Sequence, residues 1–106
     1  MHKRTYPLDK TRLKKMLDAK LKNLENIELK WISPSTYLSK VPPVSKHFNK
    51  YSAENLRKRI LGKKPLNPLY LDVKKGKIIH HEGRHRAIVS KELGVKKIPV
   101  VYYHLK

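Results

Sequence analysis

The sequence predicts a small α+β domain. The chain has 106 residues, which is enough for one modest core. Its apolar residues switch repeatedly between helical and strand spacing. The expected order of elements is helix, strand, helix, helix, strand, strand, helix, strand. We expect a basic amphipathic helix within residues 1–26 and the α+β domain over residues 27–106.

The first helix is predicted from apolar residues at helical spacing after Pro7. They are Leu13, Met16, Leu17, Leu21 and Leu24, with Lys14, Lys15 and Lys22 around the rest of the helix. From Ile27 the period changes to two, so that Ile27, Leu29 and Trp31 share one face. This pattern predicts a half-buried strand.

The middle of the chain carries helix boundary signals. Ser33 and Pro34 are typical of an N-cap and a first helical residue, and Pro42-Pro43 ends that helix. Residues 44–51 are expected to form a surface loop. Ser52 is the expected N-cap of the next helix, which Gly62 ends.

The last third predicts a hairpin, a helix and a strand. Residues 69–73 and 78–79 are the expected hairpin strands, joined by a turn at residues 74–77. Gly83 interrupts the pattern before a helix over residues 84–93, which Gly94 closes. Residues 98–103 form the last expected strand.

The charge is strongly positive. Lysine and arginine number 26 against 8 acidic residues, a formal net charge of +18, and basic residues are in excess in every third of the chain. Such a surface is tolerated most easily beside a polyanion, so nucleic acid is the first expected partner and an anionic membrane surface the second. Duplex DNA bound without sequence preference is expected, because no segment resembles a base-reading helix. A merely solubilising lysine coat is the alternative.

The composition also excludes several classes of function. Without cysteine, the chain has no disulfides, no thiolate zinc site and no cysteine nucleophile. No apolar stretch approaches the length of a membrane span, and no signal-peptide pattern follows Met1. We therefore expect a cytoplasmic location. The abundance of lysine and the lack of glutamine hint at a hot-growing source.

The segment His80-His81-Glu82-Gly83-Arg84-His85-Arg86 carries the chemistry. Amides at a helix N-terminus are unpaired, and a preceding glycine lets an anion approach the backbone closely. We call Gly83–Arg86 the arginine loop and expect it to bind phosphate, with Arg86 exposed and forked onto the phosphate oxygens. Replacing Arg86 would then lower affinity but not stability. A solvated basic turn is the alternative.

The same segment contains the pattern H-E-x-x-H, from His81 to His85, which binds zinc in some hydrolases. That motif needs an uninterrupted helix through both histidines, and Gly83 argues against one. A third ligand is missing, apart from His104 in the last expected strand. We therefore expect no metal site and rank zinc hydrolysis last.

Several segments resemble the ParB/sulfiredoxin superfamily. Residues 82–87 match its acidic residue followed by a Gly-Arg-His-Arg type loop, residues 91–94 its helix ending in Leu-Gly, and residues 98–101 its apolar-Pro-Val strand. Residues 32–38 and 65–72 give weaker support. The resemblance covers roughly residues 27–103 and implies a mixed sheet flanked by helices.

The resemblance also implies roles for individual residues. Gly83, Arg84, His85 and Arg86 match the loop that holds nucleotide phosphates, and Pro65 and Asn67 would lie at the nucleotide's other end. Glu82 and His85 are then the candidate catalytic residues. A nucleoside triphosphate with Mg²⁺ is the implied cofactor.

The chain departs from two branches of this superfamily. Arg84 stands where sulfiredoxins have their catalytic cysteine, which excludes sulfinic acid reduction. The E-N-x-x-R helix and helix-turn-helix of partition proteins are absent after the loop. Residues 54–58 imitate the former but lie upstream and end in Lys58, which argues against a clamp switched by cytidine triphosphate.

Three functions remain open. The first is a nucleic-acid-binding protein, with or without the nuclease activity of ParB-like relatives, whose footprint extends from Arg84 and Arg86 to Lys14, Lys15 and Lys22. The second is a nucleotide-dependent phosphotransferase or NTPase with Glu82 as acid-base residue. The third is a non-catalytic protein-interaction module, for instance of an archaeal virus or plasmid, because fold alone does not fix function.

Overall fold

The protein is an α+β domain built on one mixed four-stranded sheet. A computed structural model describes residues 4–43 and 49–106. The elements in chain order are α1 (Lys10–Leu17), β1 (Leu24–Ile32), α2 (Pro34–Lys40), α3 (Lys50–Leu61), β2 (Leu69–Lys74), β3 (Lys77–Glu82), α4 (Arg84–Glu92) and β4 (Ile98–Leu105). This order confirms the predicted one.

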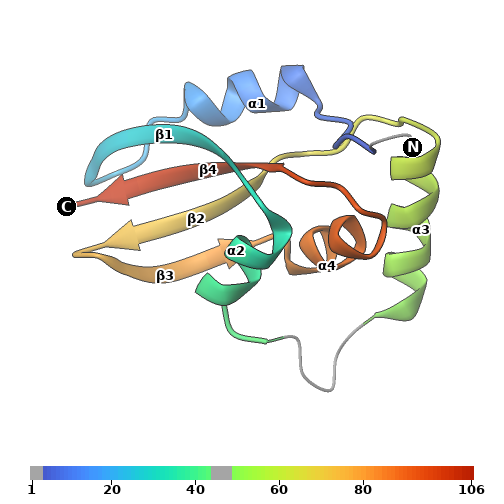
Figure 1. Cartoon of the computed structure of the whole chain (residues 1–106). Coiled ribbons are helices and arrows are strands. Elements are labelled where there is room, and N and C mark those ends of the chain that lie inside the picture. The colour runs from blue at the N-terminus through green and yellow to red at the C-terminus, as the bar shows by residue number, and fades with distance from the viewer. Residues whose placement is uncertain (1–3, 44–48) are drawn as a thin grey trace.

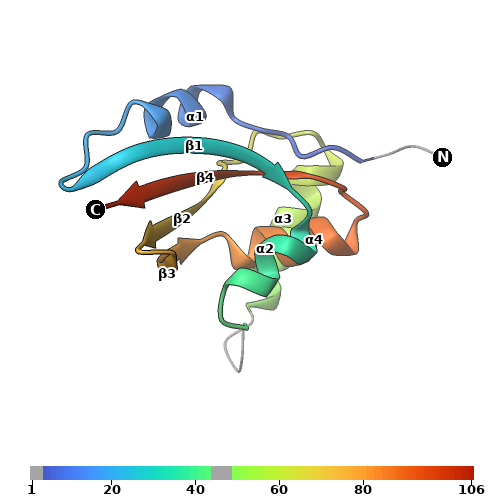
Figure 2. The same cartoon turned by 60° about the vertical axis from the view of Figure 1, so that its left-hand side comes forward.

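The sheet order is β1-β4-β2-β3. The last strand, β4, runs antiparallel to β1 and parallel to β2, while β2 and β3 form an antiparallel hairpin. Figures 1 and 2 show α1 on one face of the sheet, α2 and α4 on the other, and α3 beside α4. Because helices cover both faces, the central strand β4 is buried from Ile98 to Tyr103, as its continuous apolar run requires.

Two apolar clusters hold the layers together. The larger lies between the sheet and α2, α3 and α4, and its fully buried members include Tyr37, Leu69, Leu71, Val89 and Val100. The smaller lies under α1 and contains Met16, Val101 and Tyr103. The Tyr103 hydroxyl also donates to the Met16 carbonyl oxygen at 2.9 Å, which fastens α1 to the sheet.

The first helix is shorter than the sequence predicts. Asp9 caps α1 by accepting from the Arg12 amide at 3.1 Å, and the helix ends at Leu17. Leu24 already belongs to β1, and Asn23 turns the chain into that strand with a positive φ of 65°. The spacing from Leu17 to Leu24 fits a helix, but Leu24 packs from β1 against the cluster under α1.

The third helix begins earlier than predicted. Its N-cap is Asn49, whose side chain accepts from the Ser52 amide at 3.1 Å, so Ser52 lies inside α3 and is not its cap. The expected loop over residues 44–51 is therefore wrong from Lys50 on, and residues 44–48 lie outside the described residues. The cap of α2 is confirmed, since Ser33 Oγ accepts from the Thr36 amide at 3.1 Å.

The β2–β3 hairpin brings the chain directly to the candidate site. Lys75 and Gly76 make its turn, both with positive φ, and β3 continues to Glu82, beyond the predicted Ile79. Gly83 alone separates β3 from α4. Within the described residues, none of the helices has the length and apolarity needed to cross a membrane.

Candidate functional site

Gly83 makes the sharp junction at the base of the arginine loop. Its φ is 121°, a value that side-chain-bearing residues rarely adopt. A Cβ at this position would lie 2.4 Å from Cγ of the fully buried Leu69. Gly83 is also the N-cap of α4, and no side chain caps this helix. The predicted strand-glycine-helix junction is therefore confirmed, with its first-turn amides uncapped by any side chain.

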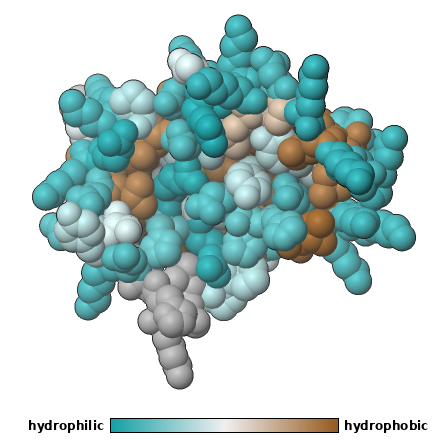
Figure 3. All heavy atoms as spheres, turned by 180° about the vertical axis from the view of Figure 1, so that it is seen from behind, coloured by the Kyte–Doolittle hydropathy of each residue, from teal (hydrophilic) through white to brown (hydrophobic). Residues whose placement is uncertain are grey.

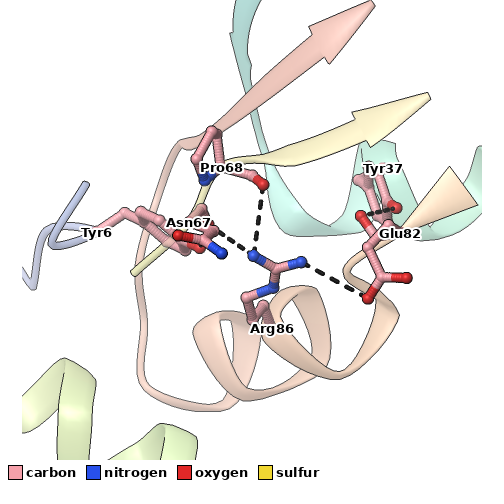
Figure 4. A network of polar contacts seen from close by, with 6 residues as sticks. All are labelled: Tyr6, Tyr37, Asn67, Pro68, Glu82 and Arg86. Carbon is pink, nitrogen blue, oxygen red and sulfur yellow. Dashed lines mark hydrogen bonds and ion pairs between the residues drawn. The ribbon is translucent and has the colours of Figure 1, made fainter. Parts of the chain in front are cut away.

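Arg86 is not the exposed phosphate ligand expected from the sequence. Its side chain is only 14% exposed. Its Nη1 donates to the carbonyl oxygens of Asn67, at 2.7 Å, and Pro68, at 3.3 Å, and its Nη2 lies 3.7 Å from Oε1 of Glu82. Figure 4 shows the guanidinium between the two carbonyl oxygens and the carboxylate of Glu82. Arg86 therefore joins α4 to the segment before β2. The prediction that Arg86 is exposed is wrong, and we now expect its loss to lower stability.

Two buried tyrosines complete this network. The Tyr6 hydroxyl donates to the Asn67 carbonyl oxygen that also accepts from Arg86, and the Tyr37 hydroxyl donates to the Glu82 carbonyl oxygen at 2.9 Å (Figure 4). Burial raises the pKa of Tyr6 to about 12 and raises that of Tyr37 well above its usual range. Both hydroxyls therefore keep their protons near neutral pH and act as donors.

Arg84 is tied to the end of the segment that follows α2. Its Nη1 donates to the carbonyl oxygens of Pro42, at 3.0 Å, and Pro43, at 3.3 Å. A guanidinium carries five N–H donors in a fixed fork, so these two contacts with one nitrogen leave donors for an anion. Arg84, and not Arg86, is thus the arginine of the loop suited to meet a ligand.

His85 accepts a hydrogen bond from the chain before α3. Its Nε2 lies 3.2 Å from the Asn49 amide nitrogen, which donates to it. An imidazole nitrogen that accepts a hydrogen bond carries no proton, so in this contact Nε2 acts as the acceptor. The Nε2 lone pair is engaged, and this nitrogen is not available as a general base while the contact holds.

The residues of the loop surround an open hollow of about 220 Å³. Its lining consists of His81, Glu82, Gly83, Arg84 and His85. The side chain of Glu82 is 65% exposed. The uncapped start of α4, the guanidinium of Arg84 and the two imidazoles suit a small anionic group such as a phosphate, whereas Glu82 adds one acidic residue to the lining.

The H-E-x-x-H pattern does not form the helical arrangement that zinc hydrolases use. His81 and Glu82 belong to β3 and His85 to the first turn of α4, with Gly83 between them. The two histidines therefore do not lie one turn apart on a helix. Among the residues that the structure describes, no three histidine or acidic side chains are grouped to hold a metal ion.

The other predicted binding residues divide into two groups. Asn67 lies next to the loop, because its carbonyl oxygen accepts from Arg86. The Pro65 carbonyl oxygen accepts instead from Arg59 of α3 at 2.6 Å. Lys14, Lys15 and Lys22 are exposed, but α1 lies on the sheet face opposite α4 (Figure 1). They do not form one continuous patch with Arg84.

Two side chains of the site have no local sequence signal. Tyr6 and Tyr37 come from the N-terminal segment and from α2, far along the chain from the carbonyls that accept from them. Their apolar neighbours in the sequence suggest only core positions. A buried tyrosine usually has a hydrogen-bond partner. This general rule predicts that both hydroxyls donate to some acceptor, but it does not say which one.

Comparison with protein families, with curated proteins and with solved structures found no match to this chain. The resemblance to the ParB/sulfiredoxin superfamily therefore stays a prediction.

Arg86→Ala is expected to destabilise the domain by about 2 kcal/mol, because the buried carbonyl of Pro68 would lose its charged donor. The Asn67 carbonyl keeps its bond from Tyr6, which limits the loss. Urea unfolding measures the effect, with Lys91→Ala, an exposed position of the same helix, as the control. An Arg86→Ala variant as stable as the control would show that the network does not support the fold.

Proposed function

We propose that this protein binds nucleic acid through its phosphate backbone, without reading the base sequence. The observation that carries the proposal is a surface of exposed and unpaired cations. Among the described residues, Lys30 is the only lysine in an ion pair. Four acidic side chains, Glu28, Asp72, Glu82 and Glu92, already have a basic partner. The remaining positive charge is free to meet a polyanion.

The distribution of this charge favours contact with a backbone over recognition of one sequence. Lysines lie on both sides of the sheet, on α1 and in the hairpin turn as well as on α4. The face opposite that of Figure 1 is largely hydrophilic, with apolar side chains confined to separate patches (Figure 3). A protein with this surface positions itself on phosphates and carries no base-specific information of its own.

The hollow at the arginine loop is the proposed site for one phosphate of that backbone. The uncapped amides at the start of α4 and the guanidinium of Arg84 are its donors. In this proposal Arg86 holds the loop in place and does not touch the ligand. This division of roles replaces the expectation that Arg86 forks onto the phosphate oxygens.

Arg84→Ala is expected to weaken duplex binding about tenfold, the size of one lost charge-assisted hydrogen bond. Fluorescence anisotropy of a labelled duplex measures it. Lys91→Ala removes one charge from the same helix and is expected to have a smaller effect, since a single exposed lysine contributes little by itself. Equal losses in the two variants would show that the hollow is not a phosphate site.

A nucleotide-dependent reaction at the same hollow is the second candidate, because its lining includes the acidic residue Glu82 as well as Arg84. A thermal-shift panel of nucleoside triphosphates, with and without Mg²⁺, tests it. A ligand at a hundred times its dissociation constant adds about 2.7 kcal/mol of stability. If the protein hydrolyses a triphosphate or DNA and the Glu82→Gln variant does not, catalysis is favoured. If no nucleotide raises the melting temperature and no hydrolysis is found, only backbone binding is supported.

A further inference from the structure

A second hollow, separate from the arginine loop, lies at the end of β1. Its volume is about 350 Å³, and its lining consists of Arg4, Thr5, Tyr6, Trp31, Lys96 and Lys97. It is larger than the hollow at the loop and falls in the size range of sites for small ligands. No acidic side chain lines it. The lining thus combines aromatic rings with three cations.

Trp31 is the unusual residue of this hollow. By strand alternation it shares the face of β1 that carries Ile27 and Leu29. Those two residues pack in the cluster under α1, whereas Trp31 lies outside that cluster and is 46% exposed. α1 packs over Ile27 and Leu29, whereas Trp31 shares the hollow with Arg4, Thr5 and Tyr6 of the segment before α1. A large flat ring therefore faces solvent at the edge strand.

The three cations differ in their contacts. The Arg4 guanidinium donates to the Leu93 carbonyl oxygen at 3.1 Å, which places its charge near the C-terminal end of α4. Lys96 and Lys97 are exposed and have no ion-pair partner among the described residues. They precede β4, whose Pro99 pairs with Trp31 in the sheet, so the lysine pair and the ring belong to neighbouring backbone positions.

The wall of the hollow is held in place before any ligand binds. Tyr6 is buried, and its hydroxyl donates to the Asn67 carbonyl oxygen that also accepts from Arg86. The chain beside it is fastened, because the Leu66 amide donates to the Pro7 carbonyl oxygen at 2.7 Å and the Asp9 amide to the Leu66 carbonyl oxygen at 2.8 Å. A fixed wall reduces the entropy lost on binding.

We propose that this hollow binds single-stranded nucleic acid, with a base stacked on Trp31 and the flanking phosphates paired with Lys96, Lys97 and Arg4. Aromatic side chains beside cations bind single strands in this way, because every base has a face that stacks and the backbone supplies the negative charge. In a duplex the base faces are already stacked on one another. The proposal rests on the proposed nucleic-acid binding and adds a preference for unpaired bases at a site of its own.

A membrane surface fits the same residues less well. Insertion into a bilayer interface needs a broad apolar face beside the cations. Among the described residues, the other large exposed apolar side chains are Leu17, Leu21, Tyr51, Leu61 and Ile79, and none of them lines this hollow. Within that part of the chain, Trp31 is thus the exposed apolar side chain of the hollow, which suits one base better than a layer of acyl chains.

Trp31 is the only tryptophan of the chain, so its fluorescence reports on this hollow alone. The full chain is titrated at low salt with a short oligothymidylate and, separately, with a duplex of the same length. Anisotropy of labelled strands measures total binding in parallel. We expect the oligothymidylate to quench Trp31 with the midpoint found by anisotropy, and the duplex to bind with little quenching.

Trp31→Ala is expected to weaken single-strand binding by about ten- to a hundredfold and to leave duplex binding almost unchanged. Tyr51→Ala, at a more exposed aromatic residue of α3, is the matched control and should change neither. The double variant Lys96→Ala/Lys97→Ala should weaken single-strand binding more than Lys74→Ala/Lys77→Ala, which removes the same charge from the hairpin. Trp31→Phe keeps a smaller stacking face and should lie between Trp31→Ala and the wild type.

The outcomes separate this proposal from the function on which it rests. If the wild type binds both nucleic acids, but Trp31 is not quenched and Trp31→Ala binds single strands normally, the hollow is not the site and backbone binding stands. If anisotropy finds no binding of either nucleic acid, both proposals fail. A blue shift of Trp31 with phosphatidylserine vesicles, without quenching by the oligonucleotide, would overturn the proposal in favour of a membrane surface.

Discussion

Replacing Gly83 by alanine is expected to destabilise the domain by about 4 kcal/mol, since two independent costs combine. The φ of 121° is strained for any residue with a Cβ, and that Cβ would lie 2.4 Å and 2.7 Å from two carbon atoms of Leu69. Leu69 is fully buried, so any shift of its side chain disturbs the packed core. Domains of this size are held by roughly 5–15 kcal/mol, so Tm should fall by on the order of 20 °C.

The hairpin offers a matched control for this variant. Gly76 also has a positive φ, 76°, but a Cβ there would meet nothing within 4 Å. Gly76→Ala should therefore cost only the conformational part, about 1 kcal/mol. Thermal and urea unfolding of both variants separate strain from steric overlap. Equal losses in the two would show that the contact of Gly83 with Leu69 is relieved by movement of the chain.

The strand-glycine-helix junction could be predicted from the sequence because its determinants are local. Gly83 follows a β-rich segment and precedes a helical pattern, and no distant residue is needed to place it. The role of Arg86 could not be predicted in this way. Its acceptors, the carbonyls of Asn67 and Pro68, are fixed by the packing of β2 against α4, and a backbone carbonyl leaves no trace in the amino-acid pattern.

The boundaries of the helices also divide into those set by local residues and those set by packing between distant segments. Ser33 can be identified as the N-cap of α2 because Pro34 follows it directly, so that the sequence points to one position for the cap. Asn49 and Ser52 are both good N-caps, and the choice between them depends on one further helical turn. The exposure of Trp31 could not be predicted, because it depends on how α1 and the segment before it lie across β1, and the leucine spacing does not fix that packing.

Affinity for duplex DNA is expected to fall about a thousandfold between 50 and 200 mM salt, if the cations of this surface neutralise about six phosphates. Each neutralised phosphate releases condensed counterions, so the logarithm of the binding constant should fall linearly with the logarithm of the salt concentration. The formal charge of +18 and the scarcity of lysine ion pairs among the described residues are the reasons to expect so steep a dependence. Anisotropy titrations at several salt concentrations give the slope.

Two comparisons make this dependence diagnostic. The double variant Lys14→Ala/Lys15→Ala removes two exposed charges of α1. If α1 contacts the duplex, the slope of the salt dependence should fall by about 2. If only the α4 side contacts the duplex, the slope should not change. Duplexes of scrambled sequence should compete equally, because phosphate contacts carry no sequence information. A lysine coat that serves only solubility predicts weak binding in 50 mM salt. Few of the described lysines have an ion-pair partner. Weak duplex binding in 50 mM salt would therefore mean that mobile ions alone balance their charge. It would end the assignment of a nucleic-acid partner.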